Sequence, residues 1–406
     1  MIGLGYIGLP TAAVMARAGL NVRGVDARPD IVDTINAGAV HIEERDLDAL
    51  VKQVVGQGLL SASLEAPVAD TYLIAVPTPF SDGHQPDISY VMAALDLIAP
   101  RVAKGSCVIL ESTSPIGTTQ QLAERLAGLR PDLAVPGVCE GEADICIAYC
   151  PERVLPGKII AELVANDRVI GGLTPRCSER AAAFYRRFVS GDCLPTQAGA
   201  AEMVKLAENS FRDVNIAFAN ELSLVAEDLD IDVWDVIRLA NRHPRVEILQ
   251  PGPGVGGHCI AVDPWFLVAG APGRTRVIRT AREVNDAKPH HVAARLRAMA
   301  DSAPDAKLAL LGLAFKPNID DFRESPALQI AESLADLGPR LLVVEPFADA
   351  LPGSLADSGA QLVEFATAMK DAELVGVLVD HDAFRNTPPQ MHRGKTVYDT
   401  RGMWAI

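Results

Sequence analysis

The sequence predicts an α/β protein with two Rossmann-like, doubly wound parallel-sheet domains, joined by a long central helix and a helical dimerisation region. Short apolar strands alternate with amphipathic helices up to about residue 190 and again after residue 300, a rhythm typical of parallel sheets with helices on both faces. Residues 202–228 contain neither glycine nor proline, and apolar residues recur there at helical spacing. We therefore expect three parts, at residues 1–193, 194–300 and 301–406.

The elements of the first part follow one another in a regular order. A glycine-rich loop at residues 3–8 leads into a helix that runs to Ala18. Only Met1 and Ile2 precede this loop, whereas a central first strand normally takes about five residues. Either the start of the sequence is misassigned or trimmed, or that strand is stunted. Further strands are expected at residues 22–25, 72–76, 107–111, 145–149 and 168–170.

The middle part is expected to be helical, and the last part is expected to contain a second parallel sheet. After the long helix, a loop rich in glycine and proline occupies residues 250–257, and a second helical stretch continues to about residue 300. A second strand–helix–strand pattern begins at residue 308. Its later strands are expected at residues 340–345, 374–380 and 396–399.

Composition and charge narrow the class of protein. A chain of 406 residues with 49% hydrophobic and 22% charged residues is typical of a globular protein with two or three cores. The net charge of −15 argues against nucleic acid or an anionic membrane as a partner. No apolar run reaches the length of about 18 residues that would predict a membrane span, and the chain opens in a glycine loop without a signal peptide. We expect a cytoplasmic protein.

The seven cysteines predict neither disulfides nor a metal site. They are scattered, and none forms a Cys-x-x-Cys pair. The nearest two, Cys146 and Cys150, lie in a segment typical of a buried strand, and no histidine or cysteine follows at the spacing of zinc ligands.

The loop Gly3-x-Gly5-x-x-Gly8 predicts a dinucleotide site. Its glycines permit a tight turn, close approach of a pyrophosphate and close packing of the following helix, whose N-terminus faces the phosphates. Asp26 ends the next expected strand, where its carboxylate can accept hydrogen bonds from both ribose hydroxyls and would repel a 2′-phosphate. NAD is therefore favoured over NADP, and a glycine turn without a ligand is the alternative.

Cys259 follows Gly256 and Gly257 and predicts covalent chemistry. An enzyme that oxidises an alcohol through an aldehyde to an acid needs a nucleophile to hold the aldehyde while a second hydride leaves. The glycines would let a substrate approach and leave the sulfur open. The alternative is a small buried hydrophobic residue, which most free cysteines are.

Other polar residues point to the same chemistry. Lys205, Asn209 and Arg212 fall at helical spacing on one face, where a lysine and an asparagine can stabilise an oxyanion; a solvated polar stripe is the alternative. Glu152 follows an expected strand and is a candidate general base for water. Cations at residues 242–245, 316 and 323 indicate a second ligand that bears phosphate.

The chain resembles the UDP-glucose/GDP-mannose dehydrogenase family from end to end. The resemblance rests on residues 3–10, 73–80, 109–117, 147–157, 202–224, 239–266 and 312–326. It implies a four-electron oxidation of a sugar C6 alcohol to a carboxylate with two NAD, in a homodimer or larger assembly. One departure is Val262, where the UDP-glucose branch has a lysine. This favours an N-acetylated substrate such as UDP-N-acetyl-D-mannosamine, and leaves UDP-N-acetyl-D-glucosamine and UDP-glucose open.

The resemblance also implies roles for particular residues. Cys259 would be the nucleophile and Lys205 a proton donor or acceptor, with Asn209 and Asp263 assisting and Glu152 serving hydrolysis. NAD would contact Gly3, Gly5, Tyr6, Ile7, Gly8, Asp26, Thr78, Thr119 and Arg323. The nucleotide sugar would contact Arg153, Val154, Lys205, Asn209, Arg212, His243, Arg245, Gly256 and Lys316, with Arg245 a candidate to enter from the neighbouring subunit.

Two other functions fit some of these motifs. A two-electron hydroxyacid-type dehydrogenase would share the glycine loop and the helix lysine, but would need neither Cys259 nor the second nucleotide fold. An NAD-binding regulator without catalytic activity would bind the cofactor and oxidise no sugar.

Overall fold

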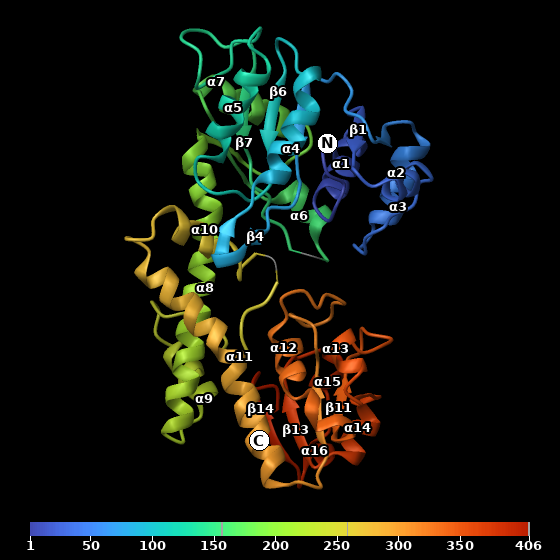
Figure 1. Ribbon diagram of the computed structural model, residues 1–406, viewed down its shortest axis with the longest axis vertical. Helices are drawn as coiled ribbons and strands as arrows, with labels where there is room; N and C mark the ends of the chain where they lie inside the picture. The colour runs from blue at the N-terminus through green and yellow to red at the C-terminus, as the bar shows by residue number, and fades with distance from the viewer. Residues whose placement is uncertain (156, 258, 405–406) are drawn as a thin grey trace. The chain divides into compact units, whose positions relative to one another are not determined.

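The computed structural model describes residues 1–155, 157–257 and 259–404, and contacts divide it into two compact units. The first unit comprises Met1–Glu208 and Trp265–Ala271, and the second comprises Asn209–Pro264 and Pro272–Ile406. Helix α8 (Ala198–Asp228) begins in the first unit and ends in the second (Figure 1). The long helix predicted from residue 202 thus begins earlier, at Ala198.

The sheet of the first unit is mostly parallel. Its strands lie in the order β3 (Thr71–Ile74), β6 (Cys107–Leu110), β7 (Cys146–Tyr149), β8 (Arg168–Gly172) and β9 (Cys193–Gln197), and only the β7–β8 pair among them is antiparallel. A parallel pair, β1 (Val22–Val25) and β2 (Leu60–Ser63), lies beside it. Ile2 bridges to Val25 and to Ile74, so this single residue stands where the stunted first strand was expected.

Both faces of this sheet are buried because its strands are apolar along their whole length. In β6, Cys107 and Ile109 pack into one hydrophobic cluster, whereas Val108 and Leu110 pack into another. The first cluster includes helices α1 (Gly8–Arg17), α3 (Leu47–Gly56), α6 (Ile159–Ala165) and α7 (Pro175–Tyr185). The second includes α4 (Ser89–Ile98) and α5 (Thr118–Leu129), and α2 (Pro29–Asn36) lies between β1 and α3 in the chain.

The second unit contains a five-stranded sheet in which every neighbouring pair is parallel. The order is β12 (Gln361–Leu362), β11 (Leu341–Val344), β10 (Leu308–Leu311), β13 (Leu374–Val377) and β14 (Thr396–Asp399). Residues of β10 alternate between two buried clusters, and short helices surround the sheet (Figure 1). These are α12 (Pro326–Ser333), α13 (Gly353–Ala356), α14 (Phe365–Asp371), α15 (Asp382–Arg385) and α16 (Pro389–His392).

Buried polar side chains join α8 to α11 (Arg276–Ser302) within the second unit. The Arg282 guanidinium donates to Asp213 at 2.5 Å, and both side chains are almost fully buried. Further along, Asn220 donates to Asn285 at 2.8 Å. The two helices therefore lie side by side. Helix α9 (Val233–Ala240) also belongs to the second unit, whereas α10 (Asp263–Gly270) begins in the second unit and ends in the first.

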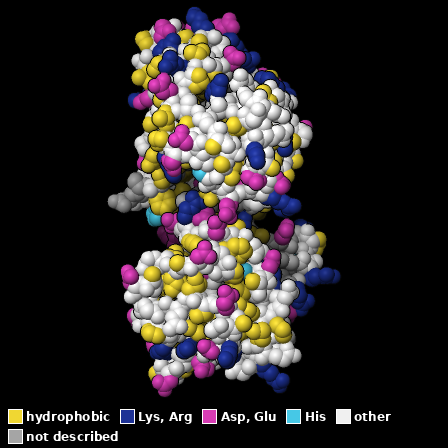
Figure 2. Space-filling view, turned by 90° about the vertical axis from the view of Figure 1, so that its right-hand side faces the viewer, with side chains coloured by type: hydrophobic (Ala, Val, Ile, Leu, Met, Phe, Trp, Pro, Cys, Tyr) yellow, Lys and Arg dark blue, Asp and Glu magenta, His cyan; other side chains and the backbone are white. Residues whose placement is uncertain are grey.

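The predicted fold class is confirmed: the structure is a mixed α/β protein with two parallel-sheet folds and a helical region between them in sequence. Strand β9 was missed because Pro195 interrupts its pattern, which an edge strand tolerates. Acidic and basic side chains are interspersed on the face shown in Figure 2. Among the described residues, no helix is both long enough and apolar enough to cross a bilayer.

Candidate active site

The three glycines of the first loop have different surroundings, and these fit a dinucleotide. A Cβ on Gly3 would lie 2.4 Å from the Ala75 carbonyl oxygen, and a Cβ on Gly8 would lie 1.9 Å from the Gly3 carbonyl oxygen. A Cβ on Gly5 would meet nothing within 4 Å. The outer glycines therefore allow the chain to pack on itself, whereas Gly5 leaves open space where a pyrophosphate can approach the backbone.

Asp26 lies directly after β1 and is anchored to the glycine loop. Its carboxylate accepts the Leu4 N–H at 3.0 Å and the Arg28 N–H at 3.0 Å. The Arg28 guanidinium pairs with Asp30 on the surface. Asp26 thus has the position expected of a carboxylate that recognises ribose hydroxyls.

The other residues predicted to contact NAD in this unit differ in exposure. Tyr6 is 46% exposed, and the Thr78 hydroxyl donates to the Thr113 carbonyl oxygen at 2.6 Å. Thr119 is fully buried, and its N–H and hydroxyl both donate to Glu202, at 2.8 and 2.7 Å. Contact of these residues, and of Ile7, with NAD stays a prediction.

Glu202 is a buried anchor that the sequence pattern did not indicate. Its carboxylate accepts the N–H groups of Gly117 and Thr119 at the start of α5. A carboxylate at a helix N-terminus satisfies otherwise unpaired N–H groups and interacts favourably with the helix dipole. Glu202 therefore fixes the start of α8 against the loop after β6.

The first unit brings Lys205 and Glu152 together. The Lys205 ammonium donates to the backbone carbonyl oxygen of Glu152 at 2.8 Å, and both side chains are buried. The Glu152 carboxylate accepts the Arg153 N–H at 2.7 Å and the Arg168 guanidinium at 2.5 Å. Lys205 is thus held in place by the same loop that carries the candidate base.

Arg153 and Val154 continue this loop. The Arg153 guanidinium donates to Glu208 at 2.7 Å and to the Asp167 carbonyl oxygen at 2.6 Å. Val154 packs against the hydrophobic cluster that contains α1. Their contact with a nucleotide sugar stays a prediction.

The second unit brings Cys259, Asn209 and Asp263 together. Cys259 is the exposed member of the seven cysteines, and its carbonyl oxygen accepts the N–H groups of Val262 and Asp263 at 3.1 and 2.8 Å. Asp263 begins α10, is buried and accepts the Asn209 side-chain amide at 2.5 Å. The thiol therefore lies on a turn that leads directly into α10 and that Asn209 holds through Asp263.

Gly256 and Gly257 are required by packing within the second unit. A Cβ on Gly256 would lie 2.4 Å from the Glu324 carbonyl oxygen, and a Cβ on Gly257 would lie 2.8 Å from the Phe315 ring. Gly257 also has φ of 82°, which side-chain-bearing residues rarely adopt. These glycines let the thiol turn pack on the loop between β10 and α12. Approach of a substrate to them stays a prediction.

The remaining predicted residues are mostly on the surface. Arg212, His243 and Arg245 are exposed, and the Arg323 guanidinium pairs with Asp321 at 2.6 Å. Roles for these residues and for Lys316 stay predictions.

The second sheet carries an acidic residue in the place that Asp26 has in the first. Glu345 directly follows β11 and is buried, and one of its oxygens accepts the N–H groups of Leu313 and Ala314 at 2.7 and 3.1 Å. Its other oxygen accepts the Phe347 N–H at 3.0 Å. The Nε2 atom of His381 lies 3.3 Å from the first oxygen. The carboxylate is thus surrounded by its own loops.

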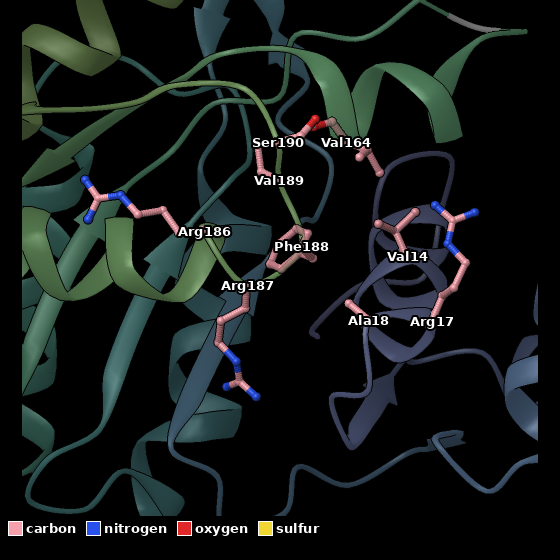
Figure 3. A pocket seen from close by; sticks show the side chains of 9 residues that line it. All are labelled: Val14, Arg17, Ala18, Val164, Arg186, Arg187, Phe188, Val189 and Ser190. Carbon is pink, nitrogen blue, oxygen red and sulfur yellow. The ribbon is translucent and has the colours of Figure 1, made fainter.

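A cavity of about 330 Å³ lies elsewhere in the first unit, at the opposite end of α1 from the glycine loop. Its lining contains none of the predicted site residues: Val14, Arg17, Ala18, Val164, Arg186, Arg187, Phe188, Val189 and Ser190. The three guanidinium groups point in different directions (Figure 3), so they do not form one anion site. Within the described ranges, no group of three His, Cys, Asp or Glu residues is placed to hold a metal ion.

Three family models match the chain in sequence order. Residues 1–189 match the NAD binding domain, residues 199–287 the central domain and residues 309–406 the UDP binding domain of the UDP-glucose/GDP-mannose dehydrogenase family. The chain belongs to this family. It is an NAD-dependent nucleotide-sugar dehydrogenase, as the resemblance in the sequence implied.

Individual relatives cover nearly the whole chain. It is 56% identical to UDP-N-acetyl-D-mannosamine dehydrogenase of Salmonella typhi, over 100% of this chain and 98% of that protein. It is 54% identical to NDP-N-acetyl-D-galactosaminuronic acid dehydrogenase of Ralstonia nicotianae, over 100% and 96%. Among solved structures, the UDP-N-acetyl-mannosamine dehydrogenase of Staphylococcus aureus aligns with a TM-score of 0.86 and 40% identity, over 100% of this chain and 95% of that one.

Proposed function

We propose that this enzyme oxidises UDP-N-acetyl-D-mannosamine at C6 to UDP-N-acetyl-D-mannosaminuronate and consumes two NAD for each sugar. The observation that carries the proposal is the exposed thiol of Cys259, on a turn that the Asn209–Asp263 hydrogen bond supports. A four-electron oxidation needs such a nucleophile, whereas a two-electron oxidation does not.

The residues would act in sequence. NAD, when bound at the glycine loop, accepts a hydride from the sugar carbon in each of the two oxidation steps. The Cys259 thiolate attacks the aldehyde left by the first oxidation to give a thiohemiacetal. Lys205 and Asn209 stabilise the charge on the aldehyde oxygen as it develops. Loss of the second hydride converts the thiohemiacetal into a thioester.

Hydrolysis of the thioester is assigned to Glu152. Its carboxylate takes a proton from water as the water oxygen bonds to the acyl carbon, and the carbon–sulfur bond breaks to return Cys259 as a thiolate. The position of Glu152 at the carboxyl end of β7 supports this role, because ligands of such sheets bind there.

The choice of sugar rests on relatives and on one residue. The relative from Salmonella typhi acts, by its name, on UDP-N-acetyl-D-mannosamine, and the relative from Ralstonia nicotianae is named for a galactosamine derivative. Val262 is buried, at 7% exposed, and it occupies the position where the UDP-glucose branch of the family has a lysine. We therefore favour an N-acetylhexosamine and, within that class, UDP-N-acetyl-D-mannosamine; the uronate would supply synthesis of a bacterial surface polysaccharide.

A homodimer is proposed from an exposed apolar face of α8. Phe211, Phe218 and Val225 recur every seven residues and are 69%, 52% and 50% exposed. Such spacing keeps side chains on one face of a helix, and a large exposed apolar face favours burial against a partner. The Phe218→Glu variant is expected to elute as a monomer in light-scattering chromatography, and an unchanged mass would refute this face. Arg245 would then be supplied by the neighbouring subunit.

The proposed reaction is tested by counting NADH for each sugar. UDP-N-acetyl-D-mannosamine is compared with UDP-N-acetyl-D-glucosamine, UDP-N-acetyl-D-galactosamine, UDP-glucose and GDP-mannose. Two NADH per UDP-N-acetyl-D-mannosamine are expected. One NADH per sugar would instead support a two-electron dehydrogenase, and NAD binding without NADH from any sugar would support a regulator.

A matched pair of cysteine variants tests the nucleophile. Cys259→Ser is expected to abolish release of the uronate, because the aldehyde is no longer captured. Cys139→Ser changes a partly exposed cysteine outside the proposed machinery and is expected to keep normal turnover. Near-normal turnover by Cys259→Ser would rule out the thioester route.

A further inference from the structure

A cluster of buried charged and polar side chains lies next to Glu152 in the first unit and takes no part in the proposed oxidation and hydrolysis steps. Its members are Arg168 at the start of β8, Tyr185 at the end of α7, and Glu111 directly after β6. All three side chains are almost completely buried. Buried charges are costly unless they are paired, so a cluster of this kind needs an explanation.

Arg168 connects the cluster to Glu152 directly. One terminal nitrogen of its guanidinium donates to the Glu152 carboxylate at 2.5 Å, and the other donates to the Leu163 carbonyl oxygen at 2.9 Å. The side chains of Arg168 and Glu152 are 2% and 6% exposed, so water screens their attraction little. Together with the Arg153 N–H, this contact gives each oxygen of Glu152 one donor and fixes its orientation.

Tyr185 and Glu111 form the layer behind Arg168. The guanidinium carbon of Arg168 lies 5.6 Å from the centre of the Tyr185 ring, within range of a cation–π interaction. The Tyr185 hydroxyl donates to one oxygen of Glu111 at 2.6 Å. In the described part of the chain, the other Glu111 oxygen is buried without a hydrogen-bond partner.

The charges of the cluster balance when Glu111 carries a proton. Burial and, to a lesser extent, the nearby Glu152 carboxylate raise the pKa of Glu111 to about 7, against the opposing effects of Tyr185, Arg168 and the N-terminal amine of Met1. Burial also raises the pKa of the neighbouring Cys150 thiol to about 12, so that thiol stays neutral. One cation, Arg168, then faces one anion, Glu152.

We propose that Arg168 is a positioning residue for thioester hydrolysis: it pairs with the Glu152 carboxylate and fixes its orientation, and the Tyr185–Glu111 pair holds the guanidinium from behind. The proposal rests on the function proposed above, because it assigns Arg168 a task only if Glu152 serves hydrolysis. An ionised carboxylate can take the proton of the attacking water, whereas a protonated one cannot.

The same contacts hold Lys205. Because the Lys205 ammonium donates to the backbone carbonyl oxygen of Glu152, a shift of the Glu152 loop would move both groups. Arg168 therefore acts on the site through Glu152 without touching the substrate.

The test replaces the cation without adding a charge. Arg168→Met removes the cation that pairs with the Glu152 carboxylate and one of the two donors that orient it. Loss of a neighbouring cation favours the neutral form of a carboxyl, so the acid limb of the kcat–pH profile is expected to move to higher pH, and kcat below the new limb is expected to fall by about 10-fold or more. In that range a burst of two NADH per site should precede slow turnover, and intact mass should reveal an acyl adduct on Cys259.

Two arginine controls separate this effect from general damage. Arg168→Lys keeps the charge and is expected to restore most of the acid limb. Arg176→Met removes an exposed arginine that pairs with Glu142 at 3.2 Å, and it should leave the pH profile unchanged. A folded Arg168→Met enzyme with a wild-type acid limb and no acyl adduct would overturn the proposal.

A second variant guards against misfolding of Arg168→Met. Tyr185→Phe removes the hydrogen bond to Glu111 while keeping the ring against Arg168, and a smaller shift of the limb in the same direction is expected. An unshifted limb in Tyr185→Phe would refute the role of the second layer. If the proposed function itself were wrong, the wild-type enzyme would fail to give two NADH per sugar, which no outcome with Arg168 variants can mimic.

Discussion

Adding one methyl group at Gly257 should lower both the stability of the protein and its turnover, and the two effects can be measured separately. In Gly257→Ala the residue keeps φ of 82°, which costs a side-chain-bearing residue about 1–2 kcal/mol. The new Cβ lies 2.8 Å from the Phe315 ring, which must shift by a few tenths of an ångström. Overpacking of this kind costs about 1–3 kcal/mol, so the free energy of unfolding is expected to fall by about 2–5 kcal/mol in total.

The same change should lower turnover, because Gly257 precedes Cys259 by two positions on the thiol turn. Misplacement of a reacting group by about 1 Å can reduce a rate about 100-fold, so a loss of kcat of about 10-fold or more is expected at temperatures where the variant is folded. Urea unfolding and NADH production measure the two effects.

Gly273→Ala is the matched control. Its Cβ meets nothing within 4 Å and its φ lies outside the left-handed region, so it should leave turnover unchanged and stability equal or slightly higher. If Gly257→Ala matched this control in both measurements, the steric account of the thiol turn would be wrong.

Three further changes test the buried charges. Burial raises the pKa of Glu111 from its ordinary value of 4.5 to about 7, so between these pH values the folded state binds a proton that the unfolded state has lost. The free energy of unfolding therefore falls by about 3 kcal/mol as pH rises through this range. Glu111→Gln should remove this pH dependence, as measured by urea unfolding between pH 4.5 and 7.5. Arg282→Met leaves Asp213 buried without its cation and should cost about 3–5 kcal/mol in urea unfolding, whereas a loss below 1 kcal/mol would contradict the buried pair. Glu202→Gln weakens the cap of α5 and should cost about 0.5–2 kcal/mol; exchange of the Thr119 amide no faster than in the wild type would argue against the cap.

The bounds of two short strands could be predicted from the sequence. The strands at residues 22–25 and 396–399 have the predicted bounds, because their ends coincide with changes in residue type. Strand β9 escaped prediction because Pro195 lies within it, and β12 did because it has only two residues. Local pattern predicts an element whose ends are marked by a change of residue type, and fails where pairing with a neighbour alone defines it.

Some residues of the candidate site could be predicted from the sequence and others could not. The glycine loop, Asp26 and Cys259 could be singled out because their chemistry depends on neighbours in the sequence. Arg168 and Glu202 could not, because each acts through a residue far along the chain: Arg168 on Glu152, and Glu202 on Thr119. A charged residue that opens an otherwise apolar strand was the one local sign that Arg168 has a buried partner.

The two sheets place an acidic residue at the same point and use it differently. Asp26 receives one N–H from its glycine loop and remains partly exposed, so it can still accept from a ribose. Glu345 is enclosed by three backbone N–H groups and by His381, which leaves it no access to a sugar. A single architecture thus recurs in an NAD binding domain and a UDP binding domain, and enclosure of its carboxylate leaves the second fold without the accessible acidic group that the first fold offers.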